Sequence, residues 1–156
     1  MISLSVEKNS AHLERGRRGE ELAAAYLEQQ GYELVAANFT LPVGRNLRGA
    51  IVSSEIDLVA YEGATLCFIE VKTRASNWFA EPQANVTRRK QRQVTRAALA
   101  YRRFFGLEDH PHRFDVVSVV LPANDDPQSQ LQVDLLRNFW TEQSLHRRRV
   151  FEHYYD

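Results

Sequence analysis

The stretch Ser54-Glu55-Ile56-Asp57-Leu58-Val59-Ala60-Tyr61-Glu62-Gly63-Ala64-Thr65-Leu66-Cys67-Phe68-Ile69-Glu70-Val71-Lys72 predicts a β-hairpin at the centre of the fold. Two apolar runs flank Glu62-Gly63, a pair typical of a two-residue turn because glycine takes a positive φ without a steric cost. If these two residues form the turn, Asp57 lies opposite Phe68 and becomes a diagonal neighbour of Glu70 on the same face. A turn one residue longer would put Asp57 on the other face.

Three charged side chains interrupt these apolar strands: Asp57, Glu70 and Lys72. A buried unpaired carboxylate is strongly disfavoured, and two neighbouring carboxylates repel each other unless a cation lies between them. Mg²⁺ resolves the conflict, because it binds oxygen ligands and is often held by one or two carboxylates. Lys72 could then orient or deprotonate a water, or stabilise charge on a phosphate. The alternative is a cluster of acids and lysine that only neutralises itself.

Asp57, followed on the next strand by Glu70-Val71-Lys72, resembles the PD-(D/E)XK signature that restriction endonucleases and archaeal Holliday-junction resolvases share. Over about residues 14–121 the chain is similar to the YraN-like family of endonucleases, although the segment between Asn38 and Glu55 is longer than usual there. The matching segments are Gly16-Arg17-Arg18-Gly19-Glu20-Glu21, Gly31-Tyr32, Asn38-Phe39, Glu55-Ile56-Asp57-Leu58, Phe68-Ile69-Glu70-Val71-Lys72-Thr73-Arg74, Lys90-Gln91 and Arg113-Phe114-Asp115-Val116-Val117.

The resemblance implies a restriction-endonuclease-like core of the α/β class, with a central mixed β-sheet flanked by helices in the order α-β-β-β-α-β. It implies Mg²⁺ or Mn²⁺ as the cofactor, held by Asp57 and Glu70, and a catalytic set of Lys72, Glu20, Asp57 and Glu70. The implied partner is DNA, with branched and single-stranded forms among the candidates, and the likeness to resolvases implies a homodimer.

A length of 156 residues indicates one domain with a substantial core. We expect a flexible tail at 1–10, a core at 11–121, and a C-terminal strand with a helix or basic tail at 122–156 packed on the same domain. The expected elements are a helix at 11–30, a strand at 32–39, a loop at 42–53, the central hairpin, a helix at 87–105, a strand at 113–121, a strand at 131–136 and a helix or tail at 139–154.

The net charge is zero at pH 7, so any nucleic-acid contact depends on local basic patches. The second predicted helix is rich in arginine and has no acidic residue, which favours phosphate contact over an ordinary solvated face. Trp78 and Phe79 in the preceding loop either stack on unpaired bases or close the edge of the core. The predicted nucleic-acid-binding residues are Arg17, Arg18, Arg74, Arg88, Arg89, Lys90, Gln91, Arg92 and Arg96.

The sequence has a single cysteine and no apolar run as long as a membrane span, and its start lacks the pattern of a signal peptide. We therefore expect a cytoplasmic protein with no membrane association. The leading interpretation is a metal-dependent endonuclease acting on DNA. The alternatives are a non-catalytic nucleic-acid-binding or assembly protein that uses the arginine-rich helix and Arg147-Arg148-Arg149, and a small-molecule metal-dependent hydrolase.

Overall fold

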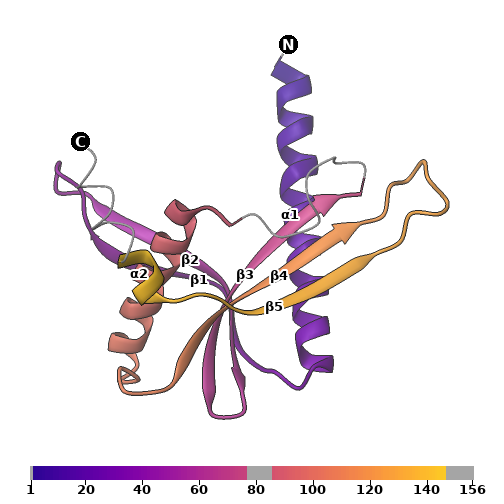
Figure 1. Ribbon diagram of the computed structural model, residues 1–156. Coiled ribbons are helices and arrows are strands. Elements are labelled where there is room, and N and C mark those ends of the chain that lie inside the picture. The colour runs from indigo at the N-terminus through magenta and orange to yellow at the C-terminus, as the bar shows by residue number, and fades with distance from the viewer. Residues whose placement is uncertain (1, 77–85, 147–156) are drawn as a thin grey trace, which may run out of the picture.

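The computed structural model describes residues 2–76 and 86–146 (Figure 1). Its strands form one sheet in the spatial order β1-β2-β3-β4-β5, antiparallel throughout except for the parallel pair β3 and β4. This arrangement confirms the predicted α/β class and the mixed sheet of a restriction-endonuclease-like core. The elements are α1 (Ile2–Gln29), β1 (Glu33–Arg45), β2 (Ile51–Glu62), β3 (Thr65–Ala75), α2 (Arg88–Phe104), β4 (His112–Leu121) and β5 (Gln132–Trp140).

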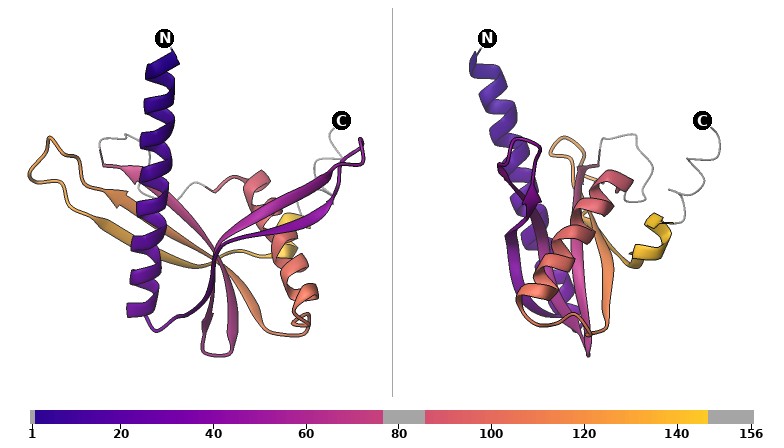
Figure 2. Two further views of the ribbon diagram at one scale, coloured as in Figure 1. Left: turned by 180° about the vertical axis from the view of Figure 1, so that it is seen from behind. Right: turned by 90° about the vertical axis from the view of Figure 1, so that its left-hand side faces the viewer.

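The two helices pack on opposite faces of the sheet, as the views in Figure 2 show. Ala23 and Leu27 of α1 are fully buried on one face, in a cluster that includes Ile69 of β3. Val94 and Ala97 of α2 are buried on the other face, as the apolar spacing predicted. Because a helix covers each face, β3 and β4 are apolar on both sides, which is common for parallel strands.

Helix α1 is longer than predicted, because it begins at Ile2 and not near Ala11. The segment 1–10, which we expected to be a flexible tail, is therefore helical from its second residue. This end of α1 projects past the sheet (Figure 1), and residues 8–15 are exposed, so no packed face signalled the helix in the sequence. Although α1 has 28 residues, neither it nor any other helix in the described ranges is both long and apolar enough to cross a membrane.

Strands β1 and β2 extend into the segment 42–53 and leave only a turn at 46–50, so the prediction of a loop over the whole segment is wrong. The two strands pair as far as Arg45 and Ile51, and the Asn46 side chain accepts hydrogen bonds from two backbone amides of the turn. Proline is tolerated in this strand because β1 lies at the edge of the sheet, where a missing N–H breaks no ladder. Glycine and proline indicated a loop, but here they belong to a bulged edge strand.

The β2–β3 hairpin turns one residue later than predicted. Glu62 pairs with Thr65, so Gly63 and Ala64 form the turn in place of Glu62 and Gly63. Gly63 has a φ of +58°, the left-handed conformation for which glycine is favoured. The sequence could not separate these two possibilities, because glycine suits either central position of such a turn.

The C-terminal segment forms β5 as far as Trp140, and the last described residues, 142–146, are helical, so the helix expected from Phe139 starts later. Two sequence predictions lie outside the described residues. These are the stacking role of Trp78 and Phe79 and the basic run Arg147-Arg148-Arg149.

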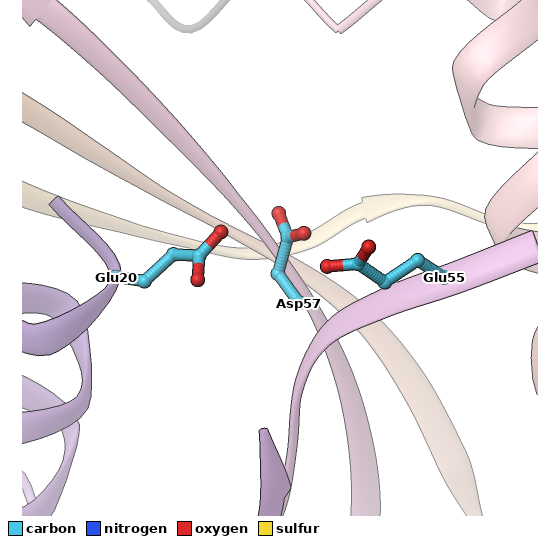
Figure 3. Close-up of side chains that lie close together, drawn as sticks. All are labelled: Glu20, Glu55 and Asp57. Carbon is cyan, nitrogen blue, oxygen red and sulfur yellow. The ribbon is translucent and has the colours of Figure 1, made fainter. Parts of the chain in front are cut away.

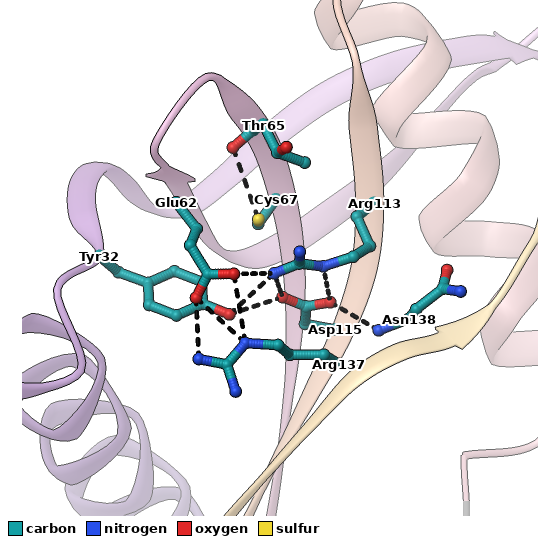
Figure 4. Close-up of polar contacts among 8 residues, drawn as sticks. All are labelled: Tyr32, Glu62, Thr65, Cys67, Arg113, Asp115, Arg137 and Asn138. Carbon is teal, nitrogen blue, oxygen red and sulfur yellow. Dashed lines mark hydrogen bonds and ion pairs between the residues drawn. The ribbon is translucent and has the colours of Figure 1, made fainter.

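A buried polar cluster ties the ends of β1, β2, β4 and β5 together (Figure 4). The Asp115 side chain is fully buried, and Arg113 donates to both of its oxygens at 2.7 and 2.8 Å. Its remaining hydrogen bonds come from the Tyr32 hydroxyl and the Asn138 amide. The charge of Asp115 is therefore paired and its oxygens are satisfied, so this residue has a structural role.

We predict that Arg113→Met lowers the free energy of unfolding by about 3–5 kcal/mol, because it leaves the buried Asp115 carboxylate without its cation. Urea denaturation followed by circular dichroism measures the change. Arg137→Met is the matched control, since Arg137 pairs with Glu62 at 2.8 Å but is 45% exposed. A solvated pair of this kind contributes at most about 1 kcal/mol. Equal losses in the two variants would contradict the assignment.

Helix α1 crosses β3 at an unusually short distance, because Gly19 faces Thr73. A Cβ atom added at Gly19 would lie 1.8 Å from Thr73 Oγ1 and 2.8 Å from its Cβ. Only a residue without a side chain lets the helix approach this closely. The contact fixes the height of α1 over the sheet one residue before Glu20.

We predict that Gly19→Ala lowers the free energy of unfolding by about 1–3 kcal/mol through overpacking against Thr73. Gly16→Ala provides the control one turn earlier on the same helix, because nothing lies within 4 Å of its added Cβ. That variant should gain up to about 1 kcal/mol from better helix propensity. Chemical denaturation of both proteins tests the sign, and a stabilised Gly19→Ala would contradict the close contact.

Candidate metal centre

The candidate site lies where β2 and β3 separate. Their pairing ends at Leu58 and Ile69, and beyond this point the two strands diverge, as Figures 1 and 2 show. One further step of the same register places Asp57 opposite Glu70, directly across instead of diagonal as predicted. Asp57 Oδ2 accepts a hydrogen bond from the Val71 amide at 2.8 Å. A carboxylate thus replaces the backbone partner that Val71 loses at the fork.

Three carboxylates converge at this fork (Figure 3). Glu20 comes from α1, and Glu55 and Asp57 come from β2. One oxygen of each lies within 4.8 Å of the others. This separation is suited to shared coordination of one divalent cation, because ligand oxygens around Mg²⁺ lie about 2.0–2.1 Å from the ion. We refer to Glu20, Glu55, Asp57 and Glu70 as the candidate metal centre.

Glu70 is the buried member of this group, with a relative exposure of 7%. Burial raises the pKa of its carboxyl to about 8, and the neighbouring charge of Asp57 and a hydrogen bond with that residue act in the same direction. The ammonium groups of Lys90 and Lys72 oppose the rise in pKa. Lys90 Nζ lies 3.7 Å from Glu70 Oε1. Glu70 Oε2 is buried and has no hydrogen-bond partner among the residues that the structure describes.

Glu20 is held in the site by β1 as well as by its own helix. Burial, the charge of Asp57 and the charge of Glu55 raise the pKa of its carboxyl, and a hydrogen bond with the Asn38 side chain opposes the rise. Asn38 has a φ of +49°, a left-handed conformation that asparagine tolerates better than most residues. This kink in β1 lies between the pairs Ala37–Leu58 and Phe39–Ile56 and so beside Asp57.

The donor set fits a hard divalent cation. All four candidate ligands are carboxylates, which suit Mg²⁺ or Mn²⁺ better than softer metals. The buried, unpaired Glu70 Oε2 is the kind of atom that a metal ion would satisfy, since an unpartnered buried oxygen is otherwise costly. The like charges of Glu20, Glu55 and Asp57 point to the same conclusion, because a cation between them removes their mutual repulsion.

The structure brings three predicted catalytic residues, Glu20, Asp57 and Glu70, to one place. Lys72 lies on β3 close enough to influence the pKa of Glu70, but it is exposed, and the lysine that pairs with Glu70 is Lys90. The catalytic and metal-binding roles of these residues stay predictions.

The predicted phosphate-binding residues separate into distinct environments. Gln91 donates to the Val86 carbonyl and Arg88 to the Ser144 carbonyl, so both have structural partners. Arg17 is exposed and pairs with two glutamates of its own helix. Arg18 lines a hollow beside the segment 121–125, and Arg74 is partly buried on β3. Exposed side chains on α2 belong to Arg89, Arg92 and Arg96.

Two residues of the site were not among the predicted ones: Glu55 and Asn38. Glu55 had a usable signal, because Glu55 and Asp57 are two apart on one strand and such residues share a face. Asn38 had no signal in its spacing. Its position beside Glu20 depends on the path of β1, which the sequence did not fix.

A mixed sheet flanked by helices, with an acidic residue on one strand and Glu70-x-Lys72 on the next, defines the restriction-endonuclease-like class with a PD-(D/E)XK arrangement. Comparison with known proteins then identifies the family. The chain belongs to the uncharacterised protein family UPF0102, the YraN-like family, whose model matches residues 19–119. This confirms the resemblance found in the sequence.

Relatives from several bacteria share most of their length with this chain. A UPF0102 protein of Chlorobium chlorochromatii is 40% identical over 132 residues, which are 83% of this chain and 94% of that protein. A UPF0102 protein of Geobacter sulfurreducens is 43% identical over 113 residues, which are 72% of this chain and 80% of that protein. A UPF0102 protein of Koribacter versatilis is 40% identical over 122 residues, which are 78% of this chain and 77% of that protein.

We predict that Glu70→Gln stabilises the metal-free protein increasingly as the pH rises from 5 to 9. The folded state holds the Glu70 proton to about pH 8, against an ordinary value of 4.5, so the stability linked to that proton is full below pH 4.5 and is lost as pH rises through 8. The glutamine variant has no such loss. At pH 9 the free energy of unfolding of the variant should exceed that of wild type by more than about 1 kcal/mol, since a tenfold change in proton affinity corresponds to about 1.4 kcal/mol.

Urea denaturation with a chelator present, at pH 5, 7 and 9, measures this difference. Glu33→Gln is the control, because Glu33 is exposed and carries no burial cost. A constant difference between Glu70→Gln and wild type across the pH range would contradict the buried position of this carboxyl.

Proposed function

We propose that this protein is a metal-dependent endonuclease that hydrolyses phosphodiester bonds in DNA. The observation that carries the proposal is the convergence of three carboxylates, Glu20, Glu55 and Asp57, at one fork in the sheet. The buried Glu70 of β3 lies beside Asp57, and two lysines lie close enough to lower its pKa. Like charges this close together destabilise a fold, and Glu70 is buried beside them, so a bound cation best explains their retention. A cation held next to lysine at an exposed edge suits a phosphate substrate.

Asp57 and Glu70 would hold the metal, with Glu20 and Glu55 completing the acidic shell. A bound Mg²⁺ or Mn²⁺ would supply charge stabilisation at the phosphate and a water that deprotonates near neutral pH. Glu70 must release its proton before it can act as a ligand, so we expect metal affinity to rise with pH up to about 8. Asp57 stays oriented through its hydrogen bond to the Val71 amide.

The two lysines have different positions and so different roles. Lys90 of α2 lies 3.7 Å from Glu70 and favours the ionised form that can bind metal. Lys72 is more exposed and is better placed to meet a substrate that arrives from solvent. Its ammonium group would stabilise the negative charge that develops on the phosphate, or orient the attacking water. The branched DNA and the homodimer implied by the likeness to resolvases belong to the same proposal.

A second candidate function is non-catalytic binding of nucleic acid. It is favoured by α2, which has no acidic residue over Arg88–Phe104 and exposes several arginines. Such a surface binds phosphates without any metal. Non-catalytic binding does not explain, however, why Glu70 is buried beside Asp57.

The test is cleavage of labelled single-stranded, duplex, flap and four-way-junction DNA with Mg²⁺ or Mn²⁺. We predict that Asp57→Asn and Lys72→Met each lower the rate by about 10²-fold or more, the usual cost of removing a group that acts in the transition state. Glu20→Gln should cost about tenfold, as expected for a residue that supports the metal ligands. Size-exclusion chromatography of the same samples reports the oligomeric state.

Glu21→Gln is the control for Glu20→Gln, because Glu21 is its exposed neighbour and pairs only with Arg17 in the described structure. This variant should cleave like wild type. If no substrate is cut while binding persists in every variant, the binding module replaces the nuclease. Cleavage that survives Asp57→Asn would exclude the proposed metal centre.

A further inference from the structure

A groove of about 630 Å³ lies between α2 and the helical turn at 142–146, on the side of α2 away from the sheet. It is separate from the candidate metal centre, with which it shares no residue. Its volume falls within the range of about 300–1,000 Å³ that is usual for small-ligand pockets, so it does not enclose a double helix. The lining residues are Arg89, Arg92, Gln93, Thr95, Arg96, Leu99, Glu142, Leu145 and His146.

Side-chain contacts hold the walls of this groove in place. Arg88 donates to the Ser144 carbonyl at 3.3 Å, and Trp140 Nε1 donates to Thr95 Oγ1 at 3.0 Å. Arg102 Nη2 pairs with Glu142 Oε1 at 3.0 Å. The groove is therefore a built feature of the fold that exists before any ligand arrives, which lowers the entropic cost of binding.

The charge of the groove is strongly positive. Arg89, Arg92 and Arg96 are exposed along one side of α2, and none of them forms an ion pair within the described ranges. Among the described lining residues Glu142 is the one acid; it pairs with Arg102 at 3.0 Å, and His112 Nε2 lies 3.3 Å from the same carboxylate oxygen. Three like charges on adjacent turns repel each other, so an anionic ligand would stabilise this arrangement.

The remaining lining is apolar or neutral. Leu99 is partly exposed and contributes aliphatic surface, and Leu145 belongs to the buried core. Cationic groups beside an apolar floor match a nucleotide strand, whose phosphates are charged and whose bases have flat apolar faces. An inorganic anion alone would leave the apolar part unused, and a duplex would hide its bases.

We propose that this groove binds single-stranded nucleic acid, with phosphates on Arg89, Arg92 and Arg96 and bases against the apolar floor at Leu99. Seven residues of helix separate the outer arginines, which is about 10.5 Å along the axis. A stacked strand carries one phosphate per about 3.4 Å, so the row spans about three phosphates.

The groove and the candidate metal centre are connected by the first turn of α2. Arg89 lies in the groove, and the next residue, Lys90, turns inward to pair with Glu70. The same first turn of α2 therefore contacts both sites. The inference rests on the proposed function only for the path of a substrate strand between them, since binding in the groove needs no metal.

The test is fluorescence anisotropy with 5′-labelled decathymidylate in EDTA, using the full chain. We predict that the double substitution Arg89→Gln with Arg92→Gln weakens binding at least tenfold in 50 mM NaCl. It should also reduce the slope of log K against log salt by about 1.4, because each lost contact to a single strand accounts for about 0.7. Unlabelled duplex of the same length should compete poorly.

Arg103→Gln is the matched control, because Arg103 is an exposed arginine of the same helix outside the groove. It should bind like wild type. An equal loss in this control, equal competition by duplex, or equal competition by a poly-glutamate peptide would each overturn the inference. Circular dichroism confirms that the variants are folded.

The binding and cleavage measurements test the groove and the nuclease proposal separately. Binding that depends on Arg89 and Arg92 but is never followed by cleavage supports the groove and removes the enzyme. Cleavage that depends on Asp57, with decathymidylate binding unchanged in the double variant, supports the enzyme and removes the groove.

Discussion

The hydrogen bond from the Val71 amide to Asp57 is the interaction on which the candidate site depends. Where β2 leaves β3, the backbone of β3 loses its partner on that side, and an unpaired amide at a buried fork is costly. A carboxylate from β2 takes the place of the missing carbonyl. The hydrogen bond that forms where β2 and β3 stop pairing therefore fixes the Asp57 side chain at the point where the strands separate. Glu70 and Glu20 lie at the same point.

Two buried carboxylates on adjacent strands show opposite solutions to the same problem. Asp115 is surrounded by Arg113, the Tyr32 hydroxyl and the Asn138 amide, so its charge is fully satisfied within the fold. Glu70 is buried nearly as deeply, but one of its oxygens lacks a partner in the described structure and its pKa rises to about 8. The first arrangement stabilises the fold. The second costs stability, which is typical of a site arranged for a ligand.

The position of Glu20 depends on a packing contact that has no charge at all. Gly19 allows α1 to approach Thr73 of β3 more closely than any side chain would permit. Gly16 and Gly19 lie one turn apart on α1, but Gly16 faces open space and Gly19 is in close contact. Helical spacing shows which residues share a side, and only the crossing of helix and strand decides which one touches.

The sequence by itself determined the class of fold, the family and the acidic pair Asp57 and Glu70. Moving a two-residue turn by one position shifts the strand register by two residues, so Asp57 and Glu70 stay on the same face. It did not determine that β1 and β2 extend to Arg45 and Ile51, since proline and glycine suit both a loop and an edge strand. Only the tertiary structure decided that Asn38 contacts Glu20 and that Lys90 pairs with Glu70. Those contacts join segments far apart in the chain, where local periodicity carries no information.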